Sequence, residues 1–210
     1  MQQISPKQRY EEDLSKPGFQ PDLAQAHAVA KLQDLYDRLV EREIGQLSAT
    51  ARLRRIFSPN TKPEPGLDFW GGVGRGKTYL VDVFYESLPF EAKLRVHFHR
   101  FMQRVHRELT VLAGEKNPLE KVAAGIAAEA RVICFDEFFV SDIADAMILA
   151  GLMTALFRRG VTLVATSNIE PCDLYKDGLQ RARFLPAIQL IEDYTDIVNV
   201  DSGVDYRLRT

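Results

Sequence analysis

A glycine-rich stretch, GGVGRGKT at residues 71–78, matches the pattern G-x-x-x-x-G-K-S/T without a mismatch. Glycines let the backbone curl so that successive N–H groups point at phosphate oxygens, and the positive end of a following helix adds to the attraction. In this pattern the lysine places a charge beside the β- and γ-phosphates, and the threonine hydroxyl ligates Mg²⁺. The stretch therefore predicts a nucleotide phosphate site with Lys77 as its cation and Thr78 as a magnesium ligand. The residues expected to contact the nucleotide are Gly71, Gly72, Val73, Gly74, Arg75, Gly76, Lys77, Thr78 and Tyr79.

Two acids, Asp136 and Glu137, directly follow the apolar segment VICF at residues 132–135. Strand ends are often charged, so the pair alone is ambiguous, but beside a phosphate loop it predicts a site for a metal and a water. Asp136 is expected to hold Mg²⁺ through water. Glu137 is positioned to take a proton from an attacking water, which suits hydrolysis better than phosphoryl transfer to a bound substrate.

One amide and two arginines complete the candidate catalytic set. Asn168 follows the apolar segment 161–167, where it is either an ordinary turn residue or a group that orients the attacking water. Arg181 and Arg183 are expected to end a helix over 171–183. Cations in a last helical turn complement the helix dipole, but an arginine can also reach the γ-phosphate of a neighbouring subunit. No spacing rule decides between these two roles.

An alternation of strands and helices must position these groups. Strands are expected at residues 67–70, 94–99, 131–135, 161–167 and 196–200. Helices are expected from the phosphate loop to residue 88 and over 100–113, 119–129, 142–159 and 171–183. This order predicts an α/β fold, a P-loop nucleotide-binding domain whose parallel sheet is covered on both faces. Ligands bind at the carboxyl ends of the strands in such sheets, where the loop, the acids and Asn168 all fall.

A helical segment precedes this alternating pattern. Asp22 is expected to cap a helix whose apolar residues recur over 29–40, with Gln25 as its capping-box partner. A second short helix is expected over 49–57, before the breaker-rich sequence SPNTKPEPG. The chain is therefore divided into an N-terminal arm with a helical segment, residues 1–64, and a nucleotide-binding core, residues 65–210.

Composition excludes several classes of protein. Of 210 residues, 46% are hydrophobic and 27% charged, which excludes a disordered or fibrous chain. The formal net charge of −2 argues against holding a polyanion by bulk charge. Cys134 and Cys172 cannot form a disulfide framework and lack metal spacing. The longest uncharged apolar stretch, 146–157, is too short to cross a bilayer, so it predicts a buried helix in a soluble, cytoplasmic protein.

With these motifs located, the chain resembles the AAA+ ATPases and, more narrowly, the ZapE family of bacterial cell-division ATPases with its mitochondrial relatives. The stretches that carry the resemblance are PDLAQAHAVAKLQDLYDRL (21–39), FWGGVGRGKTYLVDVFY (69–85), RVHFHRFMQRVHREL (95–109), ICFDEFFVSDIADAMIL (133–149), ATSNIEP (165–171) and GLQRARFLPAI (178–188). They are spread over nearly the whole chain. The resemblance implies the sheet order 5-1-4-3-2, with Asn168 between the phosphate loop and the acids.

The resemblance also implies roles for the candidate residues. The phosphate loop becomes Walker A, and the acid pair 136–137 becomes Walker B. Asn168 becomes sensor 1, and Arg183 is preferred to Arg181 as an arginine finger that acts across a hexameric ring. Near Gln25 the family holds the adenine, although helix capping explains this residue equally well.

The activity implied by the resemblance is Mg²⁺-dependent hydrolysis of ATP. The implied partner is a protein of the bacterial division machinery, the tubulin homologue of the division ring. The alternatives are a helicase-loader-like or DNA-binding module, and a protein quality-control ATPase like the mitochondrial relatives. A GTPase is disfavoured because the chain has no N-K-x-D motif, and a kinase because Glu137 would activate water. Family members continue past the last strand into a helical lid, which we expect this chain to lack because it stops at DYRLRT; slow hydrolysis and a monomer are therefore expected.

Weaker signals lie around residues 97–107. Three arginines share one face of the expected helix: Arg100, Arg104 and Arg107. They form either a solvated face or a surface for nucleic acid or an acidic partner, with Phe101 available to stack on a base. Alternatively, Phe101 and Met102 grip a partner polypeptide. His97 and His99 alternate along the expected strand, but no further metal ligands accompany them.

Overall fold

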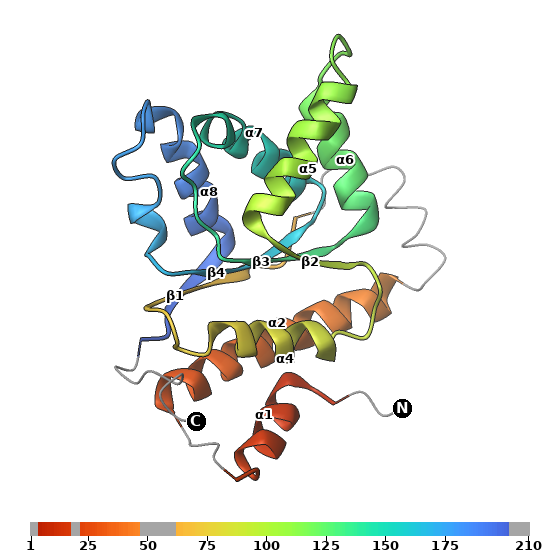
Figure 1. Ribbon diagram of the computed structural model, residues 1–210. Coiled ribbons are helices and arrows are strands. Elements are labelled where there is room, and N and C mark those ends of the chain that lie inside the picture. The colour runs from red at the N-terminus through yellow and green to blue at the C-terminus, as the bar shows by residue number, and fades with distance from the viewer. Residues whose placement is uncertain (1–3, 18–21, 47–61, 202–210) are drawn as a thin grey trace.

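The computed structural model describes residues 4–17, 22–46 and 62–201. A five-stranded parallel sheet lies at its centre (Figure 1), with the strand order β2-β3-β4-β1-β5. This order is the predicted 5-1-4-3-2 counted from the other edge, so the predicted fold is confirmed. The strands are β1 (Gly66–Trp70), β2 (Lys93–His97), β3 (Val132–Asp136), β4 (Thr162–Ser167) and β5 (Thr195–Asn199).

Helices cover both faces of the sheet. In Figure 1, α2 and α4 lie on one face with α1 beyond them, and α5 to α8 lie on the other face. Successive strand residues point to opposite faces, so Val132 and Cys134 join the core under α2 and α4, whereas Ile133 and Phe135 join the core under α5 to α8. The helices are α1 (Pro6–Leu14), α2 (Leu23–Gln46), α4 (Lys77–Ser87), α5 (Phe98–Val111), α6 (Pro118–Glu129), α7 (Ile143–Arg158), α8 (Leu185–Tyr194) and the short 3-10 helices η1 (Pro171–Asp173) and η2 (Arg181–Arg183).

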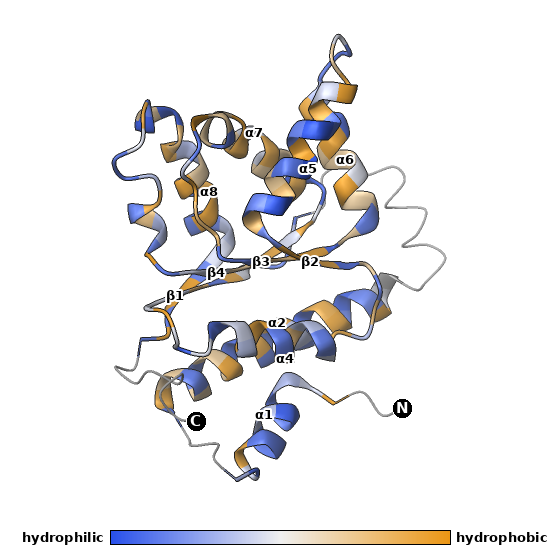
Figure 2. Ribbon diagram, in the orientation of Figure 1, coloured by the Kyte–Doolittle hydropathy of each residue, from blue (hydrophilic) through white to orange (hydrophobic). Residues whose placement is uncertain are grey.

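Local signals set both ends of α7 where the sequence predicted them. Asp142 Oδ1 accepts a hydrogen bond from the Ala144 N–H at 2.6 Å, and Gly160 adopts a left-handed φ of 77° just past the helix. The helix is largely apolar in Figure 2 and contributes seven buried residues to the core, which confirms the predicted buried helix. Within the described part of the chain, no helix is long and apolar enough to cross a membrane.

The long helix α2 packs into the same core as the nucleotide-binding half of the chain. Leu32 and Leu35 of α2 are fully buried together with Leu67 and Phe69 of β1. Asp22 caps α2 as predicted, because its Oδ1 accepts hydrogen bonds from two N–H groups of the first turn at 2.7 and 3.0 Å. The division of the chain after residue 64 stays a prediction. The short helix expected over 49–57 lies outside the described residues.

The strand predicted over 94–99 ends earlier, at His97, and α5 begins at Phe98. The chain bends here because Phe98 buries its ring against Phe135 and Phe138, with centroids 5.5 and 4.6 Å apart. The prediction was wrong for His99, which lies on a helix. The alternation of polar and apolar residues in this segment does not indicate which side chain is buried in the core.

The single helix predicted over 171–183 is also wrong. The segment instead forms η1, a turn and η2, and α8 begins only at Leu185, with Pro186 in its first turn. Tyr175 and Gln180 have left-handed φ angles of 55° and 57°. Gly178 lies against the Tyr175 ring so closely that a Cβ would overlap it, so the turn requires glycine there. These tight turns prevent a continuous helix.

One carboxyl group, Asp68, is fully buried in the middle of β1. Its neighbours Leu67 and Phe69 face α2 and α4, so Asp68 faces the opposite side, with Ala165 and Ile197 beside it in register. Neither of its oxygens has a hydrogen-bond partner within the described residues. Burial raises the pKa of Asp68 from 3.8 to about 7.

Asp68 should make stability fall as pH rises from about 4 to about 7. In this window the folded chain keeps a proton on Asp68 that the unfolded chain has released, so its contribution is lost progressively and is absent above the folded pKa of about 7. Asp68→Asn removes the titration. Its melting temperature relative to the original chain should therefore rise by at least ~4 °C between pH 5 and pH 8. A difference that stays constant across this range would contradict the assignment.

Candidate functional site

The glycine-rich loop joins β1 to α4 and leaves the start of the helix open. Gly74 and Gly76 adopt left-handed φ angles of 82° and 78°, which glycine tolerates without strain. Gly76 is the N-cap of α4, and no side chain of the described residues caps the helix. The first N–H groups of α4 are therefore available to an anion, together with the positive end of the helix dipole.

The buried amide of Gln25 lies against this loop. Gln25 is 3% exposed, and a Cβ at Gly76 would overlap its Nε2 atom. Its Oε1 atom has no hydrogen-bond partner in the part of the chain that the structure describes, so the predicted capping-box contact with Asp22 does not form. The contact joins the start of α2 to the phosphate loop across 51 positions of sequence. Gln25 thus lies against the loop, while its contact with a nucleotide stays a prediction, and the left-handed φ of Gly76 favours glycine there.

Two cations of the loop are held by the protein itself. Lys77 Nζ donates hydrogen bonds to the carbonyl oxygens of Gly71 and Gly72 at 2.6 and 2.8 Å. Burial lowers the pKa of Lys77, while Asp201 opposes this effect. Arg75 Nε forms an ion pair with Asp201 Oδ1 at 2.9 Å. Asp201 lies just after β5, and no motif in the sequence pointed to it.

The first turn of α4 carries the other two predicted contact residues. The Thr78 side chain is exposed at the mouth of the loop. Tyr79 donates a hydrogen bond from its hydroxyl to Asp13 Oδ2 of α1 at 2.7 Å. Burial and the Asp13 carboxylate raise the pKa of Tyr79. Its side chain therefore fastens α1 to α4, and any contact with a nucleotide would come from its backbone.

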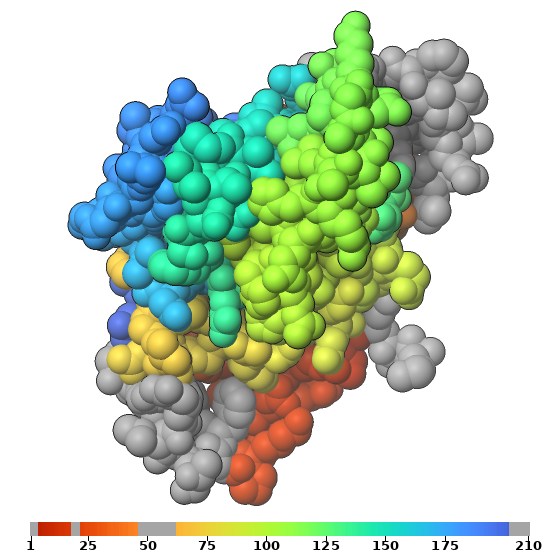
Figure 3. Space-filling model, turned by 45° about the horizontal axis from the view of Figure 1, so that its top comes forward, coloured from red at the N-terminus to blue at the C-terminus, as the bar shows by residue number. Residues whose placement is uncertain are grey.

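Parallel pairing brings the other predicted groups to the same edge of the sheet. β4 lies between β1 and β3, and its last residue, Ser167, is in register with Trp70. The loop after β1, the acids after β3 and Asn168 after β4 therefore leave the sheet at one edge. Figure 3 shows these segments (gold, teal and blue) meeting on one face of the molecule.

The two acids have different surroundings. Asp136 is the last residue of β3. Arg95 of β2 binds its carboxylate, with Nε donating to Oδ2 at 2.8 Å and Nη2 donating to Oδ1 at 3.2 Å. The Glu137 side chain is 77% exposed, and its Oε2 lies 3.9 Å from Nδ1 of His97. Glu137 has a left-handed φ of 53°, an uncommon backbone conformation for a residue other than glycine. Its N–H donates to Thr166 Oγ1 at 3.2 Å, which pins the turn to β4.

The predicted polar groups beyond the acids lie in different places. Asn168 is exposed at the carboxyl end of β4. Arg181 and Arg183 lie in η2, which packs against α7 and α8. Arg181 Nη2 donates to the Cys172 carbonyl at 2.7 Å. Arg183 is exposed, and its guanidinium makes no ion pair within the described residues. The structure gathers Asn168 with the loop and the acids, but brings neither arginine into contact with them.

Several weaker sequence signals turn out to be structural. Phe101 and Met102 are each 1% exposed, so the predictions that they stack on a base or grip a polypeptide are wrong. The reason is that this face of α5 packs on the sheet, where Phe101 lies 4.7 Å from the Phe135 ring. Arg104 is paired with Glu108 and Glu129. Only Arg100 and Arg107 of the predicted basic face remain exposed without a carboxylate partner among the described residues.

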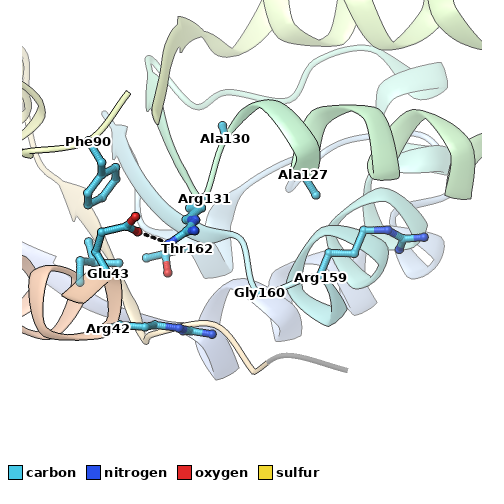
Figure 4. A pocket seen from close by; sticks show the side chains of 10 residues that line it. Arg42, Glu43, Phe90, Ala127, Ala130, Arg131, Arg159, Gly160 and Thr162 are labelled. Atoms are coloured by element: carbon cyan, nitrogen blue, oxygen red, sulfur yellow. Dashed lines mark hydrogen bonds and ion pairs between the residues drawn. The ribbon is translucent and has the colours of Figure 1, made fainter. Parts of the chain in front are cut away.

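A hollow of about 60 Å³ lies at the opposite edge of the sheet from the glycine-rich loop, where β3 and β4 begin (Figure 4). Three arginines line it, and each has a carboxylate partner: Arg42 with Glu64, Arg131 with Glu43 and Arg159 with Glu120. Paired in this way, the arginines balance charge, join α2 to the segments just before β1 and β3, and join α6 to the end of α7. Among the described residues that line this hollow, no cation is therefore left to bind an anionic ligand.

The residues at the carboxyl edge fit a nucleotide and Mg²⁺. The uncapped helix end and the half-buried Lys77 supply donors and positive charge suited to phosphate. The Thr78 hydroxyl and the Asp136 carboxylate are hard oxygen ligands of the kind that Mg²⁺ prefers. Asp136 retains acceptor positions besides those used by Arg95, because an ionised carboxylate has about four.

Comparison with known proteins adds to this geometry. The model of the AFG1-like ATPase family matches residues 4–210. The cell division protein ZapE of Escherichia coli K12 is 55% identical over 218 aligned positions, which cover all of this chain and 58% of ZapE. Lactation elevated protein 1 homolog B of Danio rerio is 47% identical over 71% of this chain and 32% of its own length. The chain thus spans little more than half the length of ZapE and about a third of the zebrafish protein.

A solved structure supports the fold. AMPPCP-bound DnaA from Aquifex aeolicus matches the whole of this chain and 53% of its own chain, with a TM-score of 0.59. The two sequences are only 13% identical, so the likeness concerns the fold alone.

Lys77→Ala should weaken binding of a fluorescent ATP analogue at least ~100-fold, because it removes both the phosphate-facing cation and the hydrogen bonds that shape the loop. The measurement is a fluorescence titration, with circular dichroism to verify folding. Lys121→Ala is the control, since Lys121 pairs with Glu115 on the surface and should leave affinity unchanged. If Lys77→Ala kept the original affinity, the loop would not be part of the nucleotide-binding site.

Proposed function

The chain belongs to the AFG1-like ATPase family, and from this premise we propose that it binds ATP with Mg²⁺ and hydrolyses ATP to ADP and phosphate. The family resemblance predicted from the motifs is confirmed by the family match and by the identity to ZapE. The observation that carries the proposal is the uncapped start of α4, with Lys77 inside its loop, at the sheet edge where β3 ends at Asp136 and is followed by Glu137.

We assign the phosphates to the backbone amides of residues 72–78 and to Lys77. Phosphate oxygens would replace the carbonyl oxygens of Gly71 and Gly72 as partners of the ammonium group. Thr78 and Asp136 would hold Mg²⁺, which neutralises phosphate charge when bound. Gln25 contributes a buried amide beside Gly76, at the start of α2 where the nucleotide would lie.

We assign the proton transfer to Glu137. Its carboxylate is exposed at the edge where the phosphates would lie, and no described cation binds it closely, so it is accessible to a water molecule. The left-handed φ of Glu137 turns the backbone away from the extended path of β3, and the hydrogen bond from the Glu137 N–H to Thr166 holds this turn in place. Asn168 leaves the adjacent strand β4 and is proposed to orient the attacking water by its amide.

We propose that Arg183 acts on the nucleotide of a neighbouring subunit in a hexamer. Its guanidinium is exposed and unpaired among the described residues, whereas Arg181 is engaged by a backbone carbonyl. A cation that acts across an interface must be available at the surface. This contrast favours Arg183 over Arg181 as the finger.

We further propose that the ATPase acts on a protein partner in bacterial cell division, with the division-ring tubulin homologue as the first candidate. A relative with 55% identity is named a cell division protein, and the net charge of −2 disfavours a polyanionic partner. The burial of Phe101 weakens the nucleic-acid alternative, which needs a stacking surface. A rise in ATP hydrolysis on addition of the purified partner tests the proposal, and salt-sensitive binding to single-stranded DNA would favour the alternative.

Glu137→Gln should bind ATP as the original chain does but hydrolyse it at least ~100-fold more slowly, because the amide cannot accept the proton of water. Phosphate release at saturating ATP measures the change. Glu170→Gln, an exposed acid after β4, is the control and should keep full activity. Undiminished hydrolysis by Glu137→Gln would show that another group is the base.

Arg183→Ala should act as a poison in mixed assemblies. If each finger serves its neighbour, activity should fall more steeply than linearly as variant subunits are mixed with original ones under conditions where light scattering detects assembly. Arg181→Ala should retain most of its activity. A strictly linear decline for Arg183→Ala would mean that Arg183 does not act across the interface.

A further inference from the structure

Arg95 links the two elements that carry the proposed magnesium ligands. Its guanidinium forms a fork on Asp136 of β3, with Nε to Oδ2 at 2.8 Å and Nη2 to Oδ1 at 3.2 Å. The remaining terminal nitrogen, Nη1, donates to Asp82 of α4. The Arg95 and Asp136 side chains are both largely buried. No motif in the sequence assigned a role to either Arg95 or Asp82.

The alternation of β2 directs this arginine towards α4. Leu94 and Val96 pack against the core under α5 to α8, so Lys93 and Arg95 face the other side of the sheet. Lys93 Nζ accordingly donates to the carbonyl oxygens of Tyr85 and Leu88 at the end of α4, at 2.8 and 2.9 Å. β2 is an edge strand, and these two cations attach it to α4 at two points. Only the Arg95 attachment includes Asp136.

The attachment point on α4 is one turn from Thr78. Asp82 follows Thr78 by four positions, so the two side chains lie on the same face of the helix. Arg95 therefore spans from the carboxylate proposed to hold Mg²⁺ to the helix face that carries the hydroxyl proposed to hold it. A fork with two donors also prevents the carboxylate from rotating, which a single contact cannot do.

We propose that Arg95 is a positioning residue for Mg²⁺·ATP, which fixes the Asp136 carboxylate relative to Thr78 through Asp82. This inference rests on the proposed function. It requires the planar guanidinium rather than positive charge alone, because a lysine ammonium cannot bind both carboxylate oxygens in the same fork. Without Arg95 the carboxylate loses its orientation, so the metal must bind to a less organised site.

The test compares Arg95→Met and Arg95→Lys with the original chain, using 2′/3′-methylanthraniloyl-ATP as the probe. Both variants should bind the probe in EDTA within about twofold of the original affinity, since Arg95 does not touch the phosphate loop. At fixed probe concentration, each should need at least ~10-fold more Mg²⁺ for half of the metal-dependent fluorescence change. The half-saturating Mg²⁺ for ATP hydrolysis should rise in parallel.

Lys93→Met is the matched control, because it loosens β2 from α4 without touching Asp136. It should leave the Mg²⁺ requirement unchanged. Three results would overturn the role of Arg95: an unchanged Mg²⁺ requirement in Arg95→Met, recovery by Arg95→Lys, or an equal rise in Lys93→Met. If Arg95→Met melts below the assay temperature, Arg95→Lys decides. Failure of the original chain to bind the probe would instead overturn the proposed function, and this inference with it.

Discussion

Parallel pairing of β1 with β4 and of β4 with β3 is the constraint on which the candidate site depends. The register aligns the carboxyl ends of these strands, so residues far apart in the chain leave the sheet at one edge. The loop before α4, the acids at 136 and 137, and Asn168 meet only because β4 is inserted between strands that precede it in sequence. An insertion or deletion that shifted β4 by one residue would turn its buried side chains to the wrong faces and separate these groups.

Charge at this edge is balanced within the chain. Lys77 lies on two loop carbonyls, Arg75 on Asp201 and Arg95 on Asp136 and Asp82. Partly buried cations need such partners, since an unpaired charge away from water is costly. A triphosphate that enters the loop must therefore compete with existing contacts, and the differences between these contacts decide which cations are able to move. Lys77 is held by neutral carbonyl oxygens, whereas Arg95 is held by two carboxylates and is the more firmly fixed of the two.

The N-terminal helices are part of this arrangement. α2 buries Leu32 and Leu35 with β1 and α4, and Tyr79 joins α4 to α1 through Asp13. The start of α2 also delivers Gln25 to the phosphate loop. The position of the loop thus depends on the packing of α2 and α1 as well as on strand pairing.

Asp68 differs from the paired charges of the site. Its buried carboxyl group has no hydrogen-bond partner among the described residues, which lowers the stability of the centre of the sheet.

The amino-acid sequence by itself determined the features that act within a few residues. The glycine pattern at 71–78, the Asp142 cap and the Gly160 stop of α7 are local, so their chemistry is visible in order along the chain. Strand order followed from the family resemblance rather than from any such local signal. The interruption at 175–180 was missed, although its left-handed residues are also local, because tyrosine and glutamine rarely adopt that conformation.

Only the tertiary structure decided which side chains are buried and which distant charges meet. Phe98 and Phe101 are buried because α5 packs on the sheet. The alternation of polar and apolar residues in this segment does not predict that burial. Arg95 meets Asp136 across 41 positions, and Gln25 meets Gly76 across 51. The physical reason is that burial and ion pairing depend on which elements become neighbours in space, whereas caps and turns depend on neighbours in the chain.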